Sequence, residues 1–210
     1  MEPLTFFIYA FTSIFVIVNP VSGILTFIAL TNGMDLSAKK EIAKRSVTVA
    51  CITAIAFAIA GEAILRFFNI TVDSLRVAGG VLLFLIAIDM LHGRVSRESV
   101  TPEEVKDASK RDDVAVFPLA IPLLTGPGAI TTVIVLIRTG KTWDLKVITL
   151  LAILLTFFLS YLFFRFADKI NKIMGVTISL VITRLMGLML AAIASNFIAE
   201  GLWNIYKSFN

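Results

Sequence analysis

The sequence has little of the chemistry that most enzymes and metal sites use. Among its 210 residues there is one cysteine, Cys51, and one histidine, His92. A single cysteine excludes an internal disulfide and a metal site built from several cysteines. One cysteine and one histidine leave no evident pair of nucleophile and base, and the sequence contains no nucleotide-binding motif. We therefore expect neither an enzyme nor a bound cofactor or metal.

Charged residues are also scarce. They make up 16% of the chain, whereas about 25% is usual for a soluble domain. Hydrophobic residues make up 58% of it, and long apolar stretches without alternation favour transmembrane helices over a β-barrel. The sequence thus predicts an all-α integral membrane protein of the cell membrane, in contact with the lipid bilayer. Its net charge of +4 does not indicate a nucleic-acid partner, because basic residues commonly flank membrane spans.

Six hydrophobic stretches are long enough to cross a bilayer. They cover approximately Leu4–Leu30, Ser46–Leu65, Ser74–Leu91, Val114–Ile137, Leu145–Phe164 and Val176–Ile198.

The first stretch is interrupted by Asn19-Pro20. Proline breaks a helix from within, yet it favours a helix start when it follows an Asn cap, so two half-helices are expected. The first half-helix, Leu4–Val18, would be about 22 Å long, so the break would fall inside a hydrocarbon layer of about 30 Å. Irregular backbone at that depth needs protein or water around it.

The same pattern returns in the second half of the chain. Matched positions are Pro20 and Pro127, Gly33 and Gly140, each 107 residues apart, and Arg76 and Arg184, 108 residues apart. Because each half has three spans, the second half must enter the membrane in the opposite direction. We expect two inverted three-helix repeats, with broken first and fourth helices, over residues 1–92 and 114–210. Two broken segments in corresponding halves are typical of a transporter's binding site.

The basic residues predict the orientation. Twelve follow the first, third and fifth spans: Lys39, Lys40, Lys44, Arg45, Arg94, Arg97, Lys106, Lys110, Arg111, Arg165, Lys169 and Lys172. Six lie on the other side: Arg66, Arg76, Arg138, Lys141, Lys146 and Lys207. This bias predicts that both termini lie outside the cytoplasm. The charged connector, residues 93–113, contains a capping-box pattern and is expected to hold a short cytoplasmic helix or to be a solvated linker.

The two breaks are the candidate substrate site. They comprise Asn19, Pro20, Val21, Ser22 and Gly23 in the first half, and Thr125, Gly126, Pro127, Gly128 and Ala129 in the second. The free N–H groups of a helix start carry partial positive charge and suit a carboxylate. In inverted halves the two helix starts could face one another across a small cavity. The alternative is a pair of proline kinks packed by small residues.

Four charged residues fall within or near the ends of the spans, namely Glu62, Arg76, Asp89 and Arg184. Charges in hydrocarbon usually face a cavity or the interior of a bundle. Either arginine could bind a carboxylate, and either acid could bind a proton or a cation. The alternative is structural ion pairing, or long side chains that reach the interface.

Three motifs resemble a known family. They are Asn19-Pro20 with Ser22-Gly23, the segment Phe117-Pro118 to Ile130 containing Leu-Leu-Thr-Gly-Pro-Gly-Ala-Ile, and Arg184-Leu-Met-Gly187 with the apolar residues after it. Together they resemble the MarC family, which includes SnatA-type neutral amino acid transporters, and the likeness covers essentially the whole chain. It implies a six-helix inner-membrane protein. For SnatA-like members it also implies transport of glycine or alanine coupled to an ion gradient.

The combined hypothesis is a secondary transporter of a small neutral amino acid, coupled to H⁺ or Na⁺ and binding its substrate at the helix breaks. The alternatives are a channel and an exporter of another small solute.

Overall fold

The computed structural model describes residues 2–93 and 114–209, so the predicted connector helix lies outside the described residues. The described part contains no strand. Its helices are α1 (Pro3–Val18), α2 (Pro20–Leu30), α3 (Leu36–Phe67), α4 (Val72–Leu91), η1 (Ala115–Leu124), α6 (Pro127–Thr139), α7 (Trp143–Arg165) and α8 (Ala167–Phe209). The all-α prediction is confirmed.

The predicted spans correspond to these helices. Within the described residues, five helical segments are long and apolar enough to cross a membrane. The pair η1 and α6, bent by 56° at its break, makes six if it is counted as one span. Both predicted breaks are present, because α1 ends at Val18 and α2 begins at Pro20, while η1 ends just before Thr125. The fourth span is also irregular earlier, since Phe117 and Ile121 are extended. Each of them precedes a proline, which disfavours the helical conformation in the residue before it.

Two helices are longer than their apolar stretches. The third helix, α3, begins at Leu36 behind an Asp35 cap, ten residues before the predicted span. The last helix, α8, runs from Ala167 to Phe209 with an interruption at Gly175, where φ is 62°. Hydropathy detects only the part of a helix that suits lipid, and both helices continue into polar sequence.

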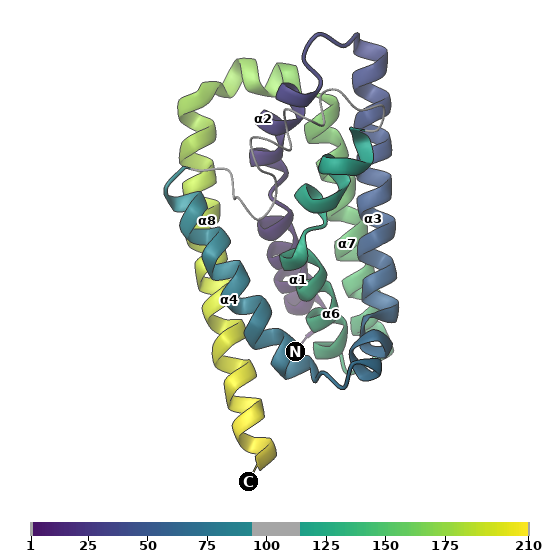
Figure 1. Cartoon of the computed structure of the whole chain (residues 1–210), viewed down its shortest axis with the longest axis vertical. Coiled ribbons are helices and arrows are strands. Elements are labelled where there is room, and N and C mark those ends of the chain that lie inside the picture. The colour runs from purple at the N-terminus through teal and green to yellow at the C-terminus, as the bar shows by residue number, and fades with distance from the viewer. Residues whose placement is uncertain (1, 94–113, 210) are drawn as a thin grey trace.

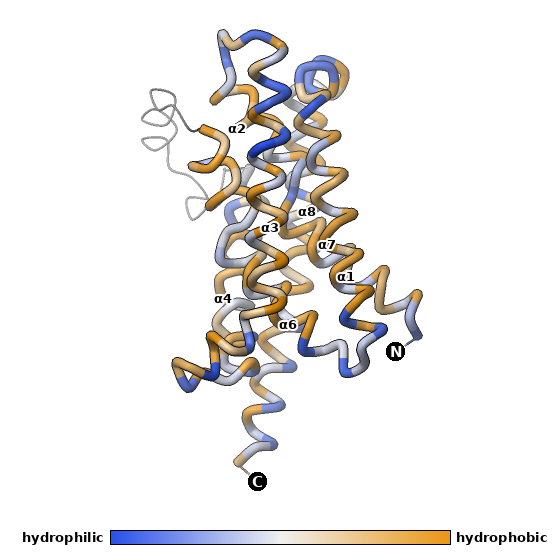
Figure 2. The backbone as a smooth tube through the Cα atoms, turned by 90° about the vertical axis from the view of Figure 1, so that its right-hand side faces the viewer, coloured by the Kyte–Doolittle hydropathy of each residue, from blue (hydrophilic) through white to orange (hydrophobic). Residues whose placement is uncertain are grey.

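The two halves run in opposite directions (Figure 1). In the first half, α1 with α2 and α4 rise from the end where the N-terminus lies, and α3 descends. In the second half the directions are reversed, because η1 with α6 and α8 descend and α7 rises. Both termini therefore lie at the same end of the molecule, called here the terminal end. Helices of one half also pack on helices of the other half. The first span (α1 and α2) packs on α7, the fourth span (η1 and α6) packs on α3, and α4 packs on α8. Two inverted repeats would pair in this way. That the two halves of the chain resemble each other in structure stays a prediction. Hydrophilic residues gather towards the two ends of the molecule (Figure 2).

The helices bury their apolar side chains in two clusters. The larger cluster joins α1, α2, α3, η1, α6 and α7, and the smaller one joins α4 and α8 with residues of α1 and α6. Glycines let α4 and α8 approach closely, because a Cβ at Gly80 would lie 2.7 Å from Ile198 and one at Gly187 would lie 2.9 Å from Met90. Small residues that allow such backbone approach are the usual means of packing membrane helices.

Candidate functional site

The break between α1 and α2 is organised by Asn19. Its backbone is left-handed, with φ 44° and ψ 61°, a conformation that Asn tolerates better than most residues. Its side-chain Oδ1 accepts a hydrogen bond from the Ser22 N–H at 3.3 Å, which fixes the orientation of the amide. The Nδ2 group then donates to Ser22 Oγ at 2.7 Å and lies 3.9 Å from Met90 Sδ. One side chain therefore closes the break and connects it to α4.

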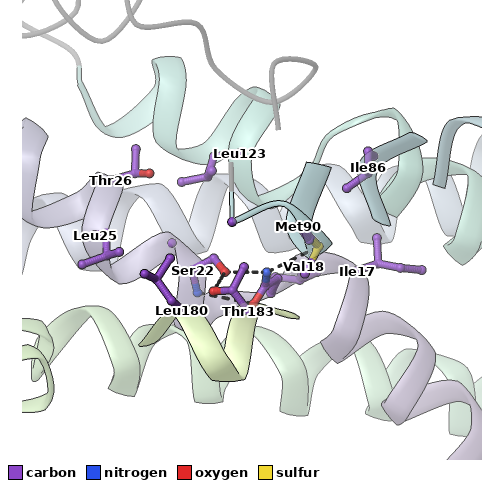
Figure 3. A pocket seen from close by; sticks show the side chains of 13 residues that line it. Ile17, Val18, Ser22, Leu25, Thr26, Ile86, Met90, Leu123, Leu180 and Thr183 are labelled. Atoms are coloured by element: carbon purple, nitrogen blue, oxygen red, sulfur yellow. Dashed lines mark hydrogen bonds between the residues drawn. The ribbon is translucent and has the colours of Figure 1, made fainter. Parts of the chain in front are cut away.

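Hydrogen bonds continue from the break to α8 (Figure 3). Ser22 Oγ lies 2.8 Å from Thr183 Oγ1, and the Thr183 hydroxyl donates to the Ser179 carbonyl at 2.8 Å. Because Thr183 has only one hydroxyl proton, the proton between the two hydroxyl groups comes from Ser22. The chain of donors thus runs in one direction, from Asn19 through Ser22 and Thr183 to Ser179.

A cavity of about 90 Å³ lies beside these residues. Its lining comes from α1, α2, α4, η1, α8 and the turn after α4: Ile17, Val18, Asn19, Ser22, Gly23, Leu25, Thr26, Ile86, Met90, Gly93, Leu123, Leu180 and Thr183. Among the described residues, none with a charged side chain borders it. The volume is well below the roughly 300–1,000 Å³ of pockets for drug-sized ligands and suits a few waters or one small solute.

The second break lies outside this cavity. Thr125 is buried, and its hydroxyl donates to the carbonyls of Ala50 and Ala120 at 3.3 and 3.1 Å. A Cβ at Gly128 would lie 2.7 Å from Leu83 of α4. Neither these residues nor Gly126, Pro127 and Ala129 line the cavity. The expectation that both breaks border one cavity is met by the first break only, because the second is packed against α3 and α4.

The N-terminus of α2 is occupied by its own cap. Besides the Ser22 bond, the Gly23 N–H donates to the Asn19 carbonyl at 3.2 Å. Pro20 has no N–H, and Pro20 and Val21 are buried and do not border the cavity. Of the first five predicted residues, the structure brings Asn19, Ser22 and Gly23 to the cavity. Their role in binding stays a prediction.

Two of the predicted charges form ion pairs near the terminal end. Glu62 lies 2.7 Å from Arg66 and 3.3 Å from Arg138 of α6. Arg76 is buried, with Nη1 3.0 Å from Glu200 of α8. These pairs agree with the structural alternative for both residues.

The other two charges lie elsewhere on the helix pair α4 and α8. Asp89 is half-buried on α4, and Arg184 is exposed on α8. Neither of them, nor Glu62 or Arg76, lines the cavity. A part in ion coupling stays a prediction for all four charges.

Sequence reasoning missed three polar or polarisable residues of the cavity, Thr26, Met90 and Thr183. Thr26 could have been found, because it follows Ser22 by four positions and so lies on the same helix face. Met90 and Thr183 are 71 and 161 residues away from their hydrogen-bond partners in the break, and no local pattern marks such contacts.

Comparisons with known proteins agree with the sequence motifs. Residues 4–206 match the model of the "MarC family integral membrane protein". The chain is 39% identical over 199 residues to a UPF0056 membrane protein of Methanocaldococcus jannaschii, covering 95% of this chain and 97% of that protein. It is 34% identical over 203 residues to the UPF0056 membrane protein YvbG of Bacillus subtilis, covering 96% of each. No solved structure matches. The motifs, the helical fold with its broken spans and these near-complete matches together show that the chain belongs to the MarC family of multi-pass integral membrane proteins.

Proposed function

We propose that this protein is a secondary transporter of small neutral amino acids in the cell membrane, and that the substrate binds in the cavity beside Asn19. The observation that carries the proposal is a small, mainly apolar cavity with four polar side chains, which lies at a helix break between two groups of helices packed in separate clusters. Broken helices at such a position are typical of secondary transporters.

The lining of the cavity supports a substrate without net charge. Among the described residues, its polar side chains offer one amide and three hydroxyls, from Asn19, Ser22, Thr26 and Thr183. In the described part of the chain, no charged side chain lines the cavity to neutralise a solute with an extra charge, and burying an unpaired charge costs several kcal/mol. The neighbouring side chains, such as Leu25, Ile86 and Leu180, are apolar. Glycine, alanine and serine fit this combination of size and polarity, and lysine does not.

The energy source in this proposal is a gradient of H⁺ or Na⁺. The sequence contains no nucleotide-binding motif, so ATP does not serve this role. Asp89 is the carboxylate that we propose for coupling, because it precedes the cavity residue Met90 on α4 and is half-buried.

Uptake into proteoliposomes tests the function. The chain should accumulate labelled alanine under an inward ion gradient, with saturation, and excess glycine or serine should compete where lysine does not. Thr183→Val should lower this uptake. Thr132→Val is a matched control, since Thr132 is also buried and donates to a carbonyl four residues earlier, but it lies outside the cavity. Folded protein that carries none of the three amino acids would overturn the proposal, and non-saturating flux would favour the channel alternative.

A further inference from the structure

Thr26 is a buried polar residue of the cavity with no assigned partner. It lies on α2 one turn after Ser22, is 7% exposed and borders the cavity. Within the described part of the chain its hydroxyl has no hydrogen bond, whereas Thr31 and Thr183 each donate to the carbonyl four residues earlier. Figure 3 places Thr26 on the Leu25 side of the cavity, away from Ile17.

The Thr26 hydroxyl is not one of the fully enclosed side-chain atoms without a partner among the described residues, so it can be reached from the cavity. Polar groups at such positions usually bind protein, water or ligand. The Thr26 hydroxyl differs from the others in the cavity because it can still donate its proton. It therefore offers a hydrogen-bond donor to an acceptor inside the cavity.

Among the described residues, the part of the cavity formed by the Asn19, Ser22 and Thr183 side chains, called here the Ser22 wall, offers acceptors only. Asn19 uses its two amide protons on Ser22 and Met90, Ser22 uses its proton on Thr183, and Thr183 uses its proton on the Ser179 carbonyl. Each of the Ser22 and Thr183 oxygens accepts one hydrogen bond and keeps a second lone pair. A group rich in donors, such as an ammonium, fits the Ser22 wall.

We infer that the cavity recognises both poles of an α-amino acid, with the ammonium on the Ser22 and Thr183 oxygens and the carboxylate on the Thr26 hydroxyl. The inference rests on the proposed function and makes it specific. Residues four apart on a helix have Cβ atoms about 5–6 Å apart, a spacing that suits two charged groups attached to one carbon. Thr26 thereby takes the role that the sequence gave to the start of α2, which Asn19 already caps.

The test compares alanine with two ligands that each lack one of its charged groups. Alanine has both poles, ethylamine lacks the carboxylate and propionate lacks the ammonium. Affinities are measured by calorimetry, or by competition with labelled alanine, on the full chain in detergent. Thr26→Val should weaken alanine binding about tenfold or more and leave ethylamine binding unchanged, because a hydrogen bond to a charged group is lost. Thr183→Val should weaken alanine and ethylamine equally and leave propionate unchanged.

Two further variants keep the result interpretable. Thr26→Ser retains the hydroxyl and should retain alanine affinity, whereas Thr26→Ala removes it without adding a methyl group and carries the test if the valine variant does not fold. Equal losses for alanine and ethylamine in Thr26→Val, or no loss in either, would overturn the role of Thr26 while leaving amino acid transport intact. Failure of the unaltered protein to bind any amino acid would instead overturn the proposed function.

Discussion

The ion pair between Arg76 and Glu200 should respond unequally to loss of its two partners. Arg76 Nη1 lies 3.0 Å from Glu200 Oε2, but the Arg76 side chain is 9% exposed and the Glu200 side chain is 58% exposed. Arg76 Nη2 also donates to Thr139 Oγ1 at 3.0 Å, and Asp73 lies 3.9 Å from Nη1. The buried partner is therefore the cation.

The exposed fractions of the two side chains determine how much stability each substitution should cost. Removing one partner of a fully buried pair costs about 3–5 kcal/mol, because it leaves a buried charge. Since Glu200 is more than half exposed, its charge is screened, and we discount the cost of Glu200→Ala to about 2–3 kcal/mol. Arg76→Met leaves Glu200 free to hydrate and fills the buried volume with an apolar chain, so it should cost about 0–1 kcal/mol.

Thermal unfolding in detergent, followed by circular dichroism, can separate the two cases. A change of 1 kcal/mol moves the Tm of a chain of this size by about 2–4 °C. Glu200→Ala should therefore lower Tm by about 4–12 °C and Arg76→Met by less than about 4 °C. The double variant should unfold no earlier than Arg76→Met alone, because no buried charge remains. If Arg76→Met is the more damaging change, or if the two effects simply add, the reasoning is refuted.

Three other outcomes can be measured with similar variants. Asn19→Ala should destabilise the fold by about 0.5–2 kcal/mol through loss of the cap, and Asn19→Gly should be milder because glycine accepts the left-handed backbone. A milder alanine variant would contradict this account. Gly80→Ala should lower folded yield in detergent, since its Cβ would lie 3.0 Å from a backbone carbonyl of α8, whereas Ala78→Leu on an exposed face should not. Accessibility tags at Lys40 and Lys141 should report opposite sides of the membrane, with Lys40 cytoplasmic, and the reverse result would overturn the predicted orientation.

The helix breaks were predictable because they follow from local chemistry. Asn19 before Pro20 encodes a capped helix start wherever it lies in the chain, and the structure has that cap. Hydropathy located the spans because it too depends only on local sequence, namely on how readily each side chain transfers from water to lipid. The polar ends of α3 and α8 were missed because helix propensity continues where hydropathy stops.

The side-chain contacts at the cavity were harder to predict from the sequence. Asn19 was correctly placed at the break, but its side chain satisfies the N–H group that a ligand was expected to use. Whether a helix start is open or capped depends on side-chain rotamers, which a sequence pattern does not specify. The meeting of Ser22 with Thr183 depends on how α2 packs against α8 across 161 residues. Tertiary packing decides such contacts.

The close fit of α4 against α8 leaves little freedom for one helix to slide along the other, because a Cβ added at either of their glycine contacts would meet the neighbouring helix within 3 Å. The same α4 is held against α6 by the hydrogen bond from Arg76 to Thr139 and by the close approach of Gly79 to Thr131. Met90 lies eleven residues beyond Gly79 on α4, about 16 Å along the helix axis, and forms part of the cavity wall. A substitution that pushes α4 away from α6 should therefore alter the shape of the cavity although it is made far from it.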